Sequence, residues 1–62
     1  MNVPLKVKII EKYGRQVDFA RVVGVRDAKV SRVIHGRDSL PPEDQTMWAR
    51  KLGANREELF AG

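Results

Sequence analysis

The sequence contains no cysteine and only one histidine among its 62 residues. Without cysteine no disulfide can hold the fold together, and a zinc site has almost no ligands to draw on. Unbroken apolar runs are short, such as Ile9-Ile10 and Val22-Val23. A membrane-spanning helix or a secretory signal peptide needs a far longer run, so the sequence predicts neither.

Aromatic residues are also scarce, at 6%, whereas apolar residues reach 42% and charged residues 32%. This apolar fraction is too high for a disordered tail, and this charged fraction is too high for a membrane protein. A chain of this length is near the lower size at which a core is stable alone, so we expect one domain over residues 1–62. The lack of cysteine fits a reducing compartment, and we expect a cytoplasmic protein.

Positive charge is concentrated in the middle of the chain. Residues 15–37 carry six Lys and Arg against two Asp, a net charge of +4, which equals the formal charge of the whole sequence. Residues 1–14 carry +2, and residues 38–62 carry −2. A basic segment beside an acidic one is typical of a surface that binds a polyanion, although a solvated face of a small domain gives the same pattern.

Apolar spacing predicts an all-α fold, a compact bundle of about five short helices. The first is expected at residues 4–13, with Pro4 in its first turn and Gly14 as its C-terminal cap. A short leading strand is the alternative, because apolar residues also alternate there: Val3, Leu5, Val7 and Ile9.

Four further helices follow. They are expected at residues 16–23, 27–34 and 43–52, and from Asn55, which has the capping-box partner Glu58 three residues later. Two apolar residues, Leu40 and Met47, are left over from the predicted core and are assigned to a homodimer contact. The large side chains Tyr13, Met47, Trp48 and Phe60 have helical spacing, which favours a core or subunit interface over a surface for stacking single-stranded nucleic acid.

The segment from Gln16 to His35 is the most informative part of the sequence. Two short helices joined by a tight turn must cross steeply, and this requires a flexible residue in the turn and a small residue at the crossing. Gly24 and Ala20 provide these. Apolar residues fill the wedge between the two helices: Phe19, Val23, Val25, Val30 and Val33.

This segment resembles the helix-turn-helix of the Cro and lambda-repressor family of phage and bacterial regulators. The glutamine, alanine and glycine expected first, fifth and ninth in the twenty-residue motif are Gln16, Ala20 and Gly24, and the apolar positions match as well. The likeness extends over about residues 5–60, from IIEKYG to WARKLGANREELF. It implies a lambda-repressor-like domain and a sequence-specific double-stranded DNA-binding transcriptional regulator, a phage or phage-like repressor that inserts helix 27–34 into the major groove of an operator.

A helical wheel of residues 27–34 predicts which side chains face DNA. Ala28, Arg32 and His35 lie opposite the apolar face, and an arginine can pair bidentately with guanine. The family's base-reading positions correspond here to Asp27, Ala28, Ser31 and Arg32. Asp27 has two interpretations: it accepts from a cytosine amine, or it serves only as a helix-start residue.

Phosphate contacts are expected around this helix. Gln16 resembles the family's phosphate-contacting glutamine, and the backbone amides at a helix start also donate to phosphate. Further candidates are basic residues on either side of the motif: Arg15, Arg26, Lys29, His35 and Arg37. The sequence departs from the family at both helix starts, where Arg15 and Arg26 replace the usual capping residues, so Asp27 is expected to cap the second helix one residue later.

Other functions receive less support from the sequence. An antitoxin that controls its own promoter and neutralises a toxin can use the same domain, and a protein-interaction adaptor can use the same scaffold without DNA. An enzyme is not expected, because no nucleophile, base and orienting group have a suitable spacing. We expect no cofactor, metal or small-molecule substrate, and a possible homodimer associated with the nucleoid of a bacterial or phage-infected cell.

Overall fold

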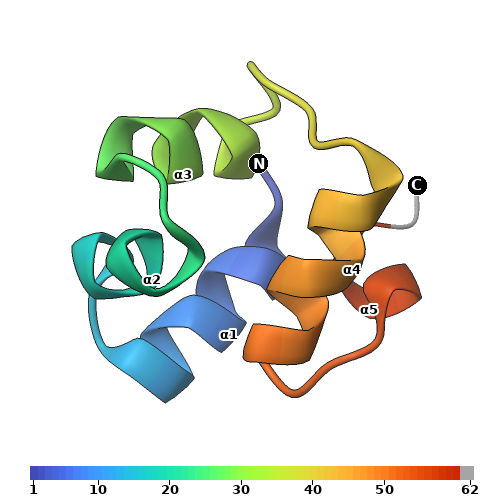
Figure 1. The fold of residues 1–62 in the computed structure, drawn as a ribbon, viewed down its shortest axis with the longest axis horizontal. Coiled ribbons are helices and arrows are strands. Elements are labelled where there is room, and N and C mark those ends of the chain that lie inside the picture. Colours follow the sequence, from blue (N-terminus) through green and yellow to red (C-terminus); the bar gives the residue numbers. More distant parts are fainter. Residues whose placement is uncertain (61–62) are drawn as a thin grey trace.

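The computed structural model describes residues 1–60, which form five α-helices and no strand (Figure 1). The helices are α1 (Val3–Tyr13), α2 (Gln16–Val23), α3 (Asp27–Ile34), α4 (Pro42–Lys51) and α5 (Arg56–Phe60). The prediction of an all-α chain with five short helices is confirmed. The alternative of a leading strand is wrong, because the alternating residues lie within α1.

The burial of α1 explains why helix wins over strand at the start of the chain. Leu5 and Ile9 are completely buried, whereas Val3 and Val7 are about half exposed. A strand would have placed all four side chains on one face, but a helix separates them onto two. The Asn2 side chain caps this helix by accepting from the Leu5 amide at 3.1 Å, and Gly14 ends it with a positive φ of 84°.

The bounds of two later helices differ from the prediction by one residue: α4, and α5, which begins at Arg56 rather than at Asn55. Helix α4 begins at Pro42 rather than at residue 43, because proline fits the first helical position, where its missing N–H has no helical partner. It ends at Lys51, with Leu52 as the C-cap. At the start of α5, the Asn55 amide donates to the Glu58 carboxylate at 3.2 Å, which is one half of the expected capping box.

All five helices contribute to a single apolar core, and so does the loop before α4. Its buried side chains are Leu5, Ile9, Phe19, Ala20, Val30, Val33, Ile34, Leu40, Trp48, Ala49, Leu52 and Leu59. The assignment of Leu40 to a dimer contact is therefore wrong, because the loop after α3 turns this residue inward. Met47 also packs against the core and is only partly buried. Trp48 is buried, and Tyr13 and Phe60 pack beside the core, as their spacing predicted.

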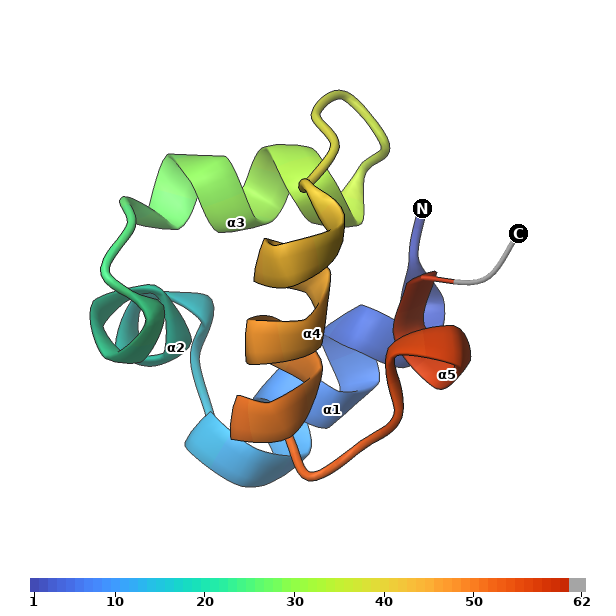
Figure 2. The same ribbon diagram turned by 45° about the vertical axis from the view of Figure 1, so that its right-hand side comes forward.

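The helices cross one another rather than forming a parallel bundle. Figure 2 shows α3 lengthwise across the top of the molecule and α2 nearly end-on below it, so the two axes cross steeply. α1 packs against α2, α3 and α5, and α4 packs against α2 and α5. This arrangement leaves uncovered the side of α3 that carries Ala28, Arg32 and His35, all of which are exposed. Among residues 1–60, none of the helices combines the length and the apolar character that crossing a bilayer requires.

Candidate nucleic-acid interface

The turn between α2 and α3 is only three residues long, from Gly24 to Arg26. Gly24 adopts a left-handed conformation with φ 77° and ψ 30°, which costs glycine little because it has no Cβ. The Val25 amide then donates to the Ala20 carbonyl at 3.0 Å and closes the turn. Because the buried Ala20 side chain is small, α3 can approach α2 closely. The left-handed Gly24 and the small Ala20 together set how α3 packs against α2.

The exposed side of α3 carries the residues that the helical wheel predicted. Val30, Val33 and Ile34 are buried, whereas Ala28, Arg32 and His35 are exposed on the opposite side. Asp27 is exposed in the first turn, and Ser31 is partly exposed on the flank. A shallow hollow in the surface is lined by Ser31, Arg32, His35 and Arg37. The structure thus brings two predicted base-reading residues beside two predicted phosphate contacts.

The orientation of His35 is set by the backbone of its own helix. Its Nδ1 lies 2.8 Å from the Ser31 carbonyl oxygen. Because a carbonyl only accepts, Nδ1 must carry a proton, and in the neutral ring Nε2 is then an acceptor. In this tautomer Nε2 can accept a hydrogen bond from a base amine and has no proton to donate to a phosphate.

A carboxylate that the sequence did not single out lies beside two of the predicted DNA contacts. Asp38, in the loop after α3, accepts a 2.8 Å hydrogen bond from Lys29 Nζ and lies 3.7 Å from Arg32 Nε. Its other oxygen accepts from the Ser39 amide at 2.9 Å. The hydrogen bond from Lys29 holds the pKa of Asp38 below its usual value, with smaller contributions from the Ser39 amide and the Arg32 charge, against an opposing effect of burial.

Both helix starts in this region lack a side-chain cap. Arg15 precedes α2 and Arg26 precedes α3, each with an extended backbone and no capping hydrogen bond. The expectation that Asp27 caps α3 is wrong, because Asp27 is already the first helical residue. Arg15 forms a 3.0 Å ion pair with Asp18 in the first turn of α2. Gln16, the first residue of α2, is partly exposed beside it.

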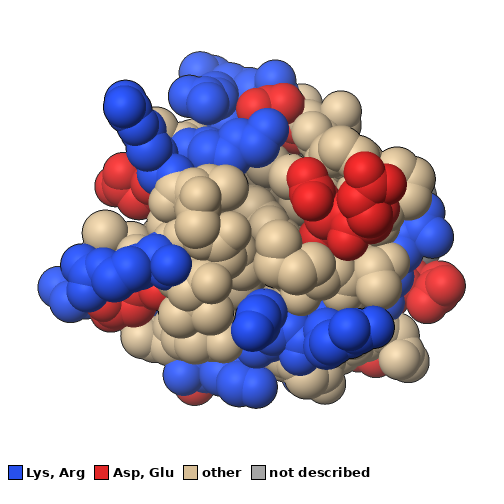
Figure 3. Space-filling model, viewed as in Figure 1, with Lys and Arg blue, Asp and Glu red and all other residues tan. Residues whose placement is uncertain are grey.

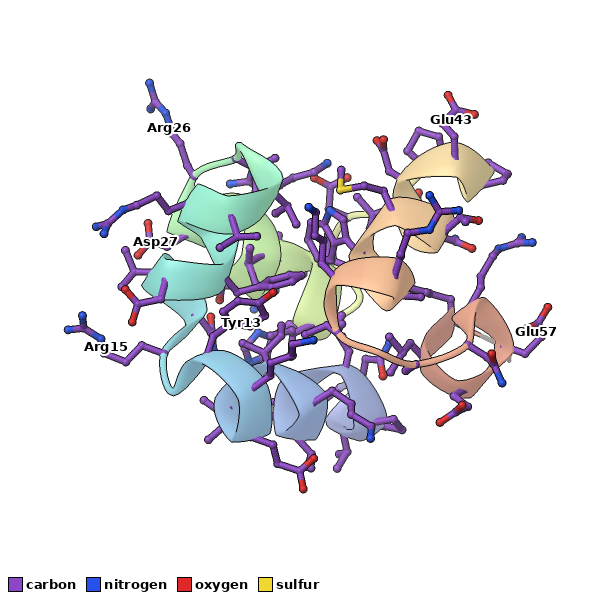
Figure 4. The ribbon with its side chains drawn as sticks, turned by 60° about the horizontal axis from the view of Figure 1, so that its bottom comes forward. Tyr13, Arg15, Arg26, Asp27, Glu43 and Glu57 are labelled. Atoms are coloured by element: carbon purple, nitrogen blue, oxygen red, sulfur yellow. The ribbon has the colours of Figure 1, made fainter. Side chains whose placement is uncertain are left out.

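Charged side chains are distributed unequally over the molecule. Figure 4 shows Arg15, Arg26 and Asp27 on one side, with both arginines extending away from the body, and Glu43 and Glu57 on the other side. In Figure 3, Lys and Arg side chains gather over α3 and α2, carboxylates lie over the start of α4, and further cations lie below. Within the described chain, no three His, Cys, Asp or Glu side chains are grouped so that they could hold a metal ion.

No protein-family model, curated protein or solved structure matches the chain significantly. The roles of the residues described above therefore depend on the chain's own geometry and chemistry.

Proposed function

We propose that α2, the three-residue turn and α3 form a helix-turn-helix that binds double-stranded DNA by inserting α3 into the major groove. The observation that carries this proposal is the uncovered side of α3, where Ala28, Arg32 and His35 are exposed together. The major groove admits one α-helix, and an arginine there reads guanine while an alanine contacts the thymine methyl group. Ser31 and Asp27 complete the proposed base-reading set.

The uncapped starts of α2 and α3 support phosphate binding beside this helix. A helix start carries partial positive charge, so an arginine at the capping position is unfavourable and leaves amides without a side-chain partner. An anion at the same place reverses both effects, because it accepts from the amides and pairs with the guanidinium. Arg15 and Arg26 extend from the same side of the molecule, as expected of two groups that contact neighbouring phosphates (Figure 4).

The remaining phosphate candidates lie on either side of the reading helix. Gln16 is partly exposed at the start of α2, and Arg37 follows α3 and lines the same hollow as Arg32. These contacts are expected to add affinity without sequence information. Lys29 is a weaker candidate, because Asp38 binds it and its side chain is only 29% exposed. Arg15 is also paired, with Asp18, but its side chain is 74% exposed and remains accessible to a phosphate.

A transcriptional regulator, acting as a repressor by occupying an operator, is the biological role that this chemistry supports best. A single domain of this size makes a small interface, so we expect two copies on a pseudo-palindromic operator with half-sites about 34 Å apart. An antitoxin would bind DNA with the same face, and a small toxin that co-purifies with the chain distinguishes that role. An adaptor is disfavoured, because the exposed face of α3 carries Arg32 and His35 rather than apolar or acidic side chains.

The proposal is tested by selecting duplexes from a random DNA pool with the purified protein. We expect enrichment of a defined sequence, and an affinity that falls as salt rises, because bound phosphates release counterions. A palindromic sequence among the selected duplexes would identify the target and indicate that two copies of the chain bind it. If no sequence is enriched, DNA reading by α3 is wrong and the adaptor becomes the better hypothesis.

A further inference from the structure

Asp38 contacts Lys29 and Arg32, two side chains of α3 that the proposed function places beside a strongly negative polymer. A carboxylate there is repelled by phosphates, so a surface used only for affinity would not retain it. The Asp38 carboxylate is nevertheless stabilised by two hydrogen bonds, which it accepts from Lys29 and from the Ser39 amide. Its side chain is about one-third exposed, so the protein covers most of it and solvent reaches the rest.

Lys29 is the residue that Asp38 affects most directly. The 2.8 Å hydrogen bond directs the ammonium group toward the loop after α3, and the side chain is 29% exposed. An ammonium paired in this way contributes little net charge to a neighbouring phosphate. Asp38 therefore removes one cation from the set that would bind any DNA sequence.

Arg32 is affected differently. Its Nε lies 3.7 Å from the same carboxylate oxygen, which is an electrostatic contact without a hydrogen bond, and its side chain is 52% exposed. The carboxylate thus attracts the Nε side of the guanidinium while leaving its terminal amino groups free. Because a bidentate contact to guanine depends on geometry, holding the guanidinium in one orientation favours base reading.

We propose that Asp38 is a specificity-determining residue, which neutralises Lys29 against non-specific phosphate binding and orients Arg32 toward the bases. The inference rests on the proposed function of α3. Non-specific binding depends on phosphate neutralisation alone, so the only effect of the carboxylate on it is a loss of affinity. On the operator the better-oriented Arg32 offsets part of this loss. Asp38 therefore raises the ratio of specific to non-specific affinity.

The test measures affinity for the selected duplex and for a scrambled duplex of equal length, across a series of salt concentrations, in the wild type and in Asp38→Asn. One additional phosphate contact steepens the slope of log affinity against log salt by about 0.9, which corresponds to about eightfold tighter non-specific binding at 0.1 M salt, relative to the value at 1 M. We expect this gain on the scrambled duplex and a smaller gain, or a loss, on the selected duplex. The ratio of the two affinities should fall.

Two further variants separate this role from a general effect of charge. Glu57→Gln changes the net charge by the same amount but lies in α5, away from Arg15 and Arg26 (Figure 4) and away from α3 (Figure 2), so it should leave the ratio unchanged. The double variant Lys29→Gln with Asp38→Asn restores the wild-type charge at the cluster and should return the salt dependence on scrambled DNA to the wild-type value. Circular dichroism and thermal unfolding confirm that each variant is folded.

The outcomes also distinguish this inference from the proposed function. If the wild type enriches no duplex, the proposed function itself is wrong. If the wild type selects a sequence but Asp38→Asn and Glu57→Gln alter the affinity ratio equally, the function stands and the role of Asp38 is overturned. The role is likewise overturned if the double variant keeps the steeper salt dependence of Asp38→Asn.

Discussion

The ring of Phe19 in α2 meets that of Trp48 in α4 in a T-shaped contact, with centroids 5.1 Å apart and planes at 88°. Both side chains are buried, and Tyr13 of α1 packs against Phe19 at 5.4 Å. Such edge-to-face pairs add to the free energy gained by burial alone. The contact holds α2 on α4, and α3 then follows through the short turn. The position of α3, the proposed reading helix, therefore depends on contacts among Tyr13, Phe19 and Trp48, none of which belongs to α3.

Replacement of Phe19 by alanine should remove a large part of the stability of the protein, or unfold it. Deleting a buried phenylalanine costs about 3–5 kcal/mol. A chain of 62 residues has a total stability of roughly 3–9 kcal/mol. We expect the loss of cooperative thermal unfolding, measured by circular dichroism, or a large fall in Tm. Val22→Ala, at an exposed position of the same helix, should change stability by less than about 0.5 kcal/mol, and a comparable loss there would contradict the assignment of the core.

Gly24→Ala tests the turn between α2 and α3. A Cβ built at Gly24 meets no atom within 4 Å, so the expected cost comes from the positive φ of 77° and not from a clash. A non-glycine residue in this conformation costs of order 1–3 kcal/mol, and asparagine tolerates it better than alanine. Chemical denaturation should therefore rank the wild type above Gly24→Asn and Gly24→Ala last. Equal stability of all three would mean that the turn relaxes to another conformation.

The sequence predicted the helices well because their ends are marked locally. Glycines with positive φ follow α1 and α2. The four-residue spacing of Leu5 and Ile9 matches the face of α1 that is buried in the core. Leu40 was assigned wrongly, since its burial depends on the path of a loop that no periodic pattern describes. The cap of α3 was also assigned wrongly, because Arg26 takes the extended backbone of a capping residue without the side chain for it.

The candidate site was predicted only in part for a related reason. A helical wheel gives the exposed face of α3 directly, so Ala28, Arg32 and His35 were placed correctly. It gives no information about residues that reach this face from elsewhere. Asp38 comes from a loop nine residues after Lys29, and only the three-dimensional path of the chain brings the two together. The carboxylate that neutralises a predicted phosphate contact was therefore missed.

Arg26→Ser should weaken DNA binding and stabilise the fold. Serine at the capping position can accept from the free amides at the start of α3, which stabilises a protein by about 1 kcal/mol. The same change removes one proposed phosphate contact, so the salt dependence of DNA binding should become less steep by about 1. Thermal unfolding and a salt titration measure the two effects. Arg50→Ser, in the last turn of α4, has the same charge change and should show neither.

Arg32→Ala should relax the preference for one base pair of the selected operator. A bidentate arginine contributes about 1–3 kcal/mol of discrimination against the wrong base. Affinities for the operator and its single-base variants should show this loss at one position, with little change elsewhere. Arg15→Ala should instead weaken binding to all of these duplexes alike and reduce the salt dependence by about 1. If both variants weaken every duplex equally, Arg32 contacts phosphate and not a base.

Asp38 should make the stability of the fold depend on pH in the acidic range. The hydrogen bond from Lys29 lowers the pKa of Asp38 in the folded state, so ionised Asp38 stabilises the fold above its ordinary pKa of 3.8. This contribution disappears as the pH falls through the folded pKa. The difference in unfolding free energy between the wild type and Asp38→Asn should therefore be constant from pH 7 to pH 5 and shrink below about pH 4.

Urea denaturation at a series of pH values between 7 and 3 measures this difference. Lys29→Gln provides the matched comparison, because it removes the partner with the largest effect on the pKa of Asp38. In that background, the effect of Asp38→Asn on the unfolding free energy should be smaller at neutral pH and should change less in acid. An effect that stays constant down to pH 3, or that is the same with and without Lys29, would show that the 2.8 Å pair contributes no stability to the fold in solution.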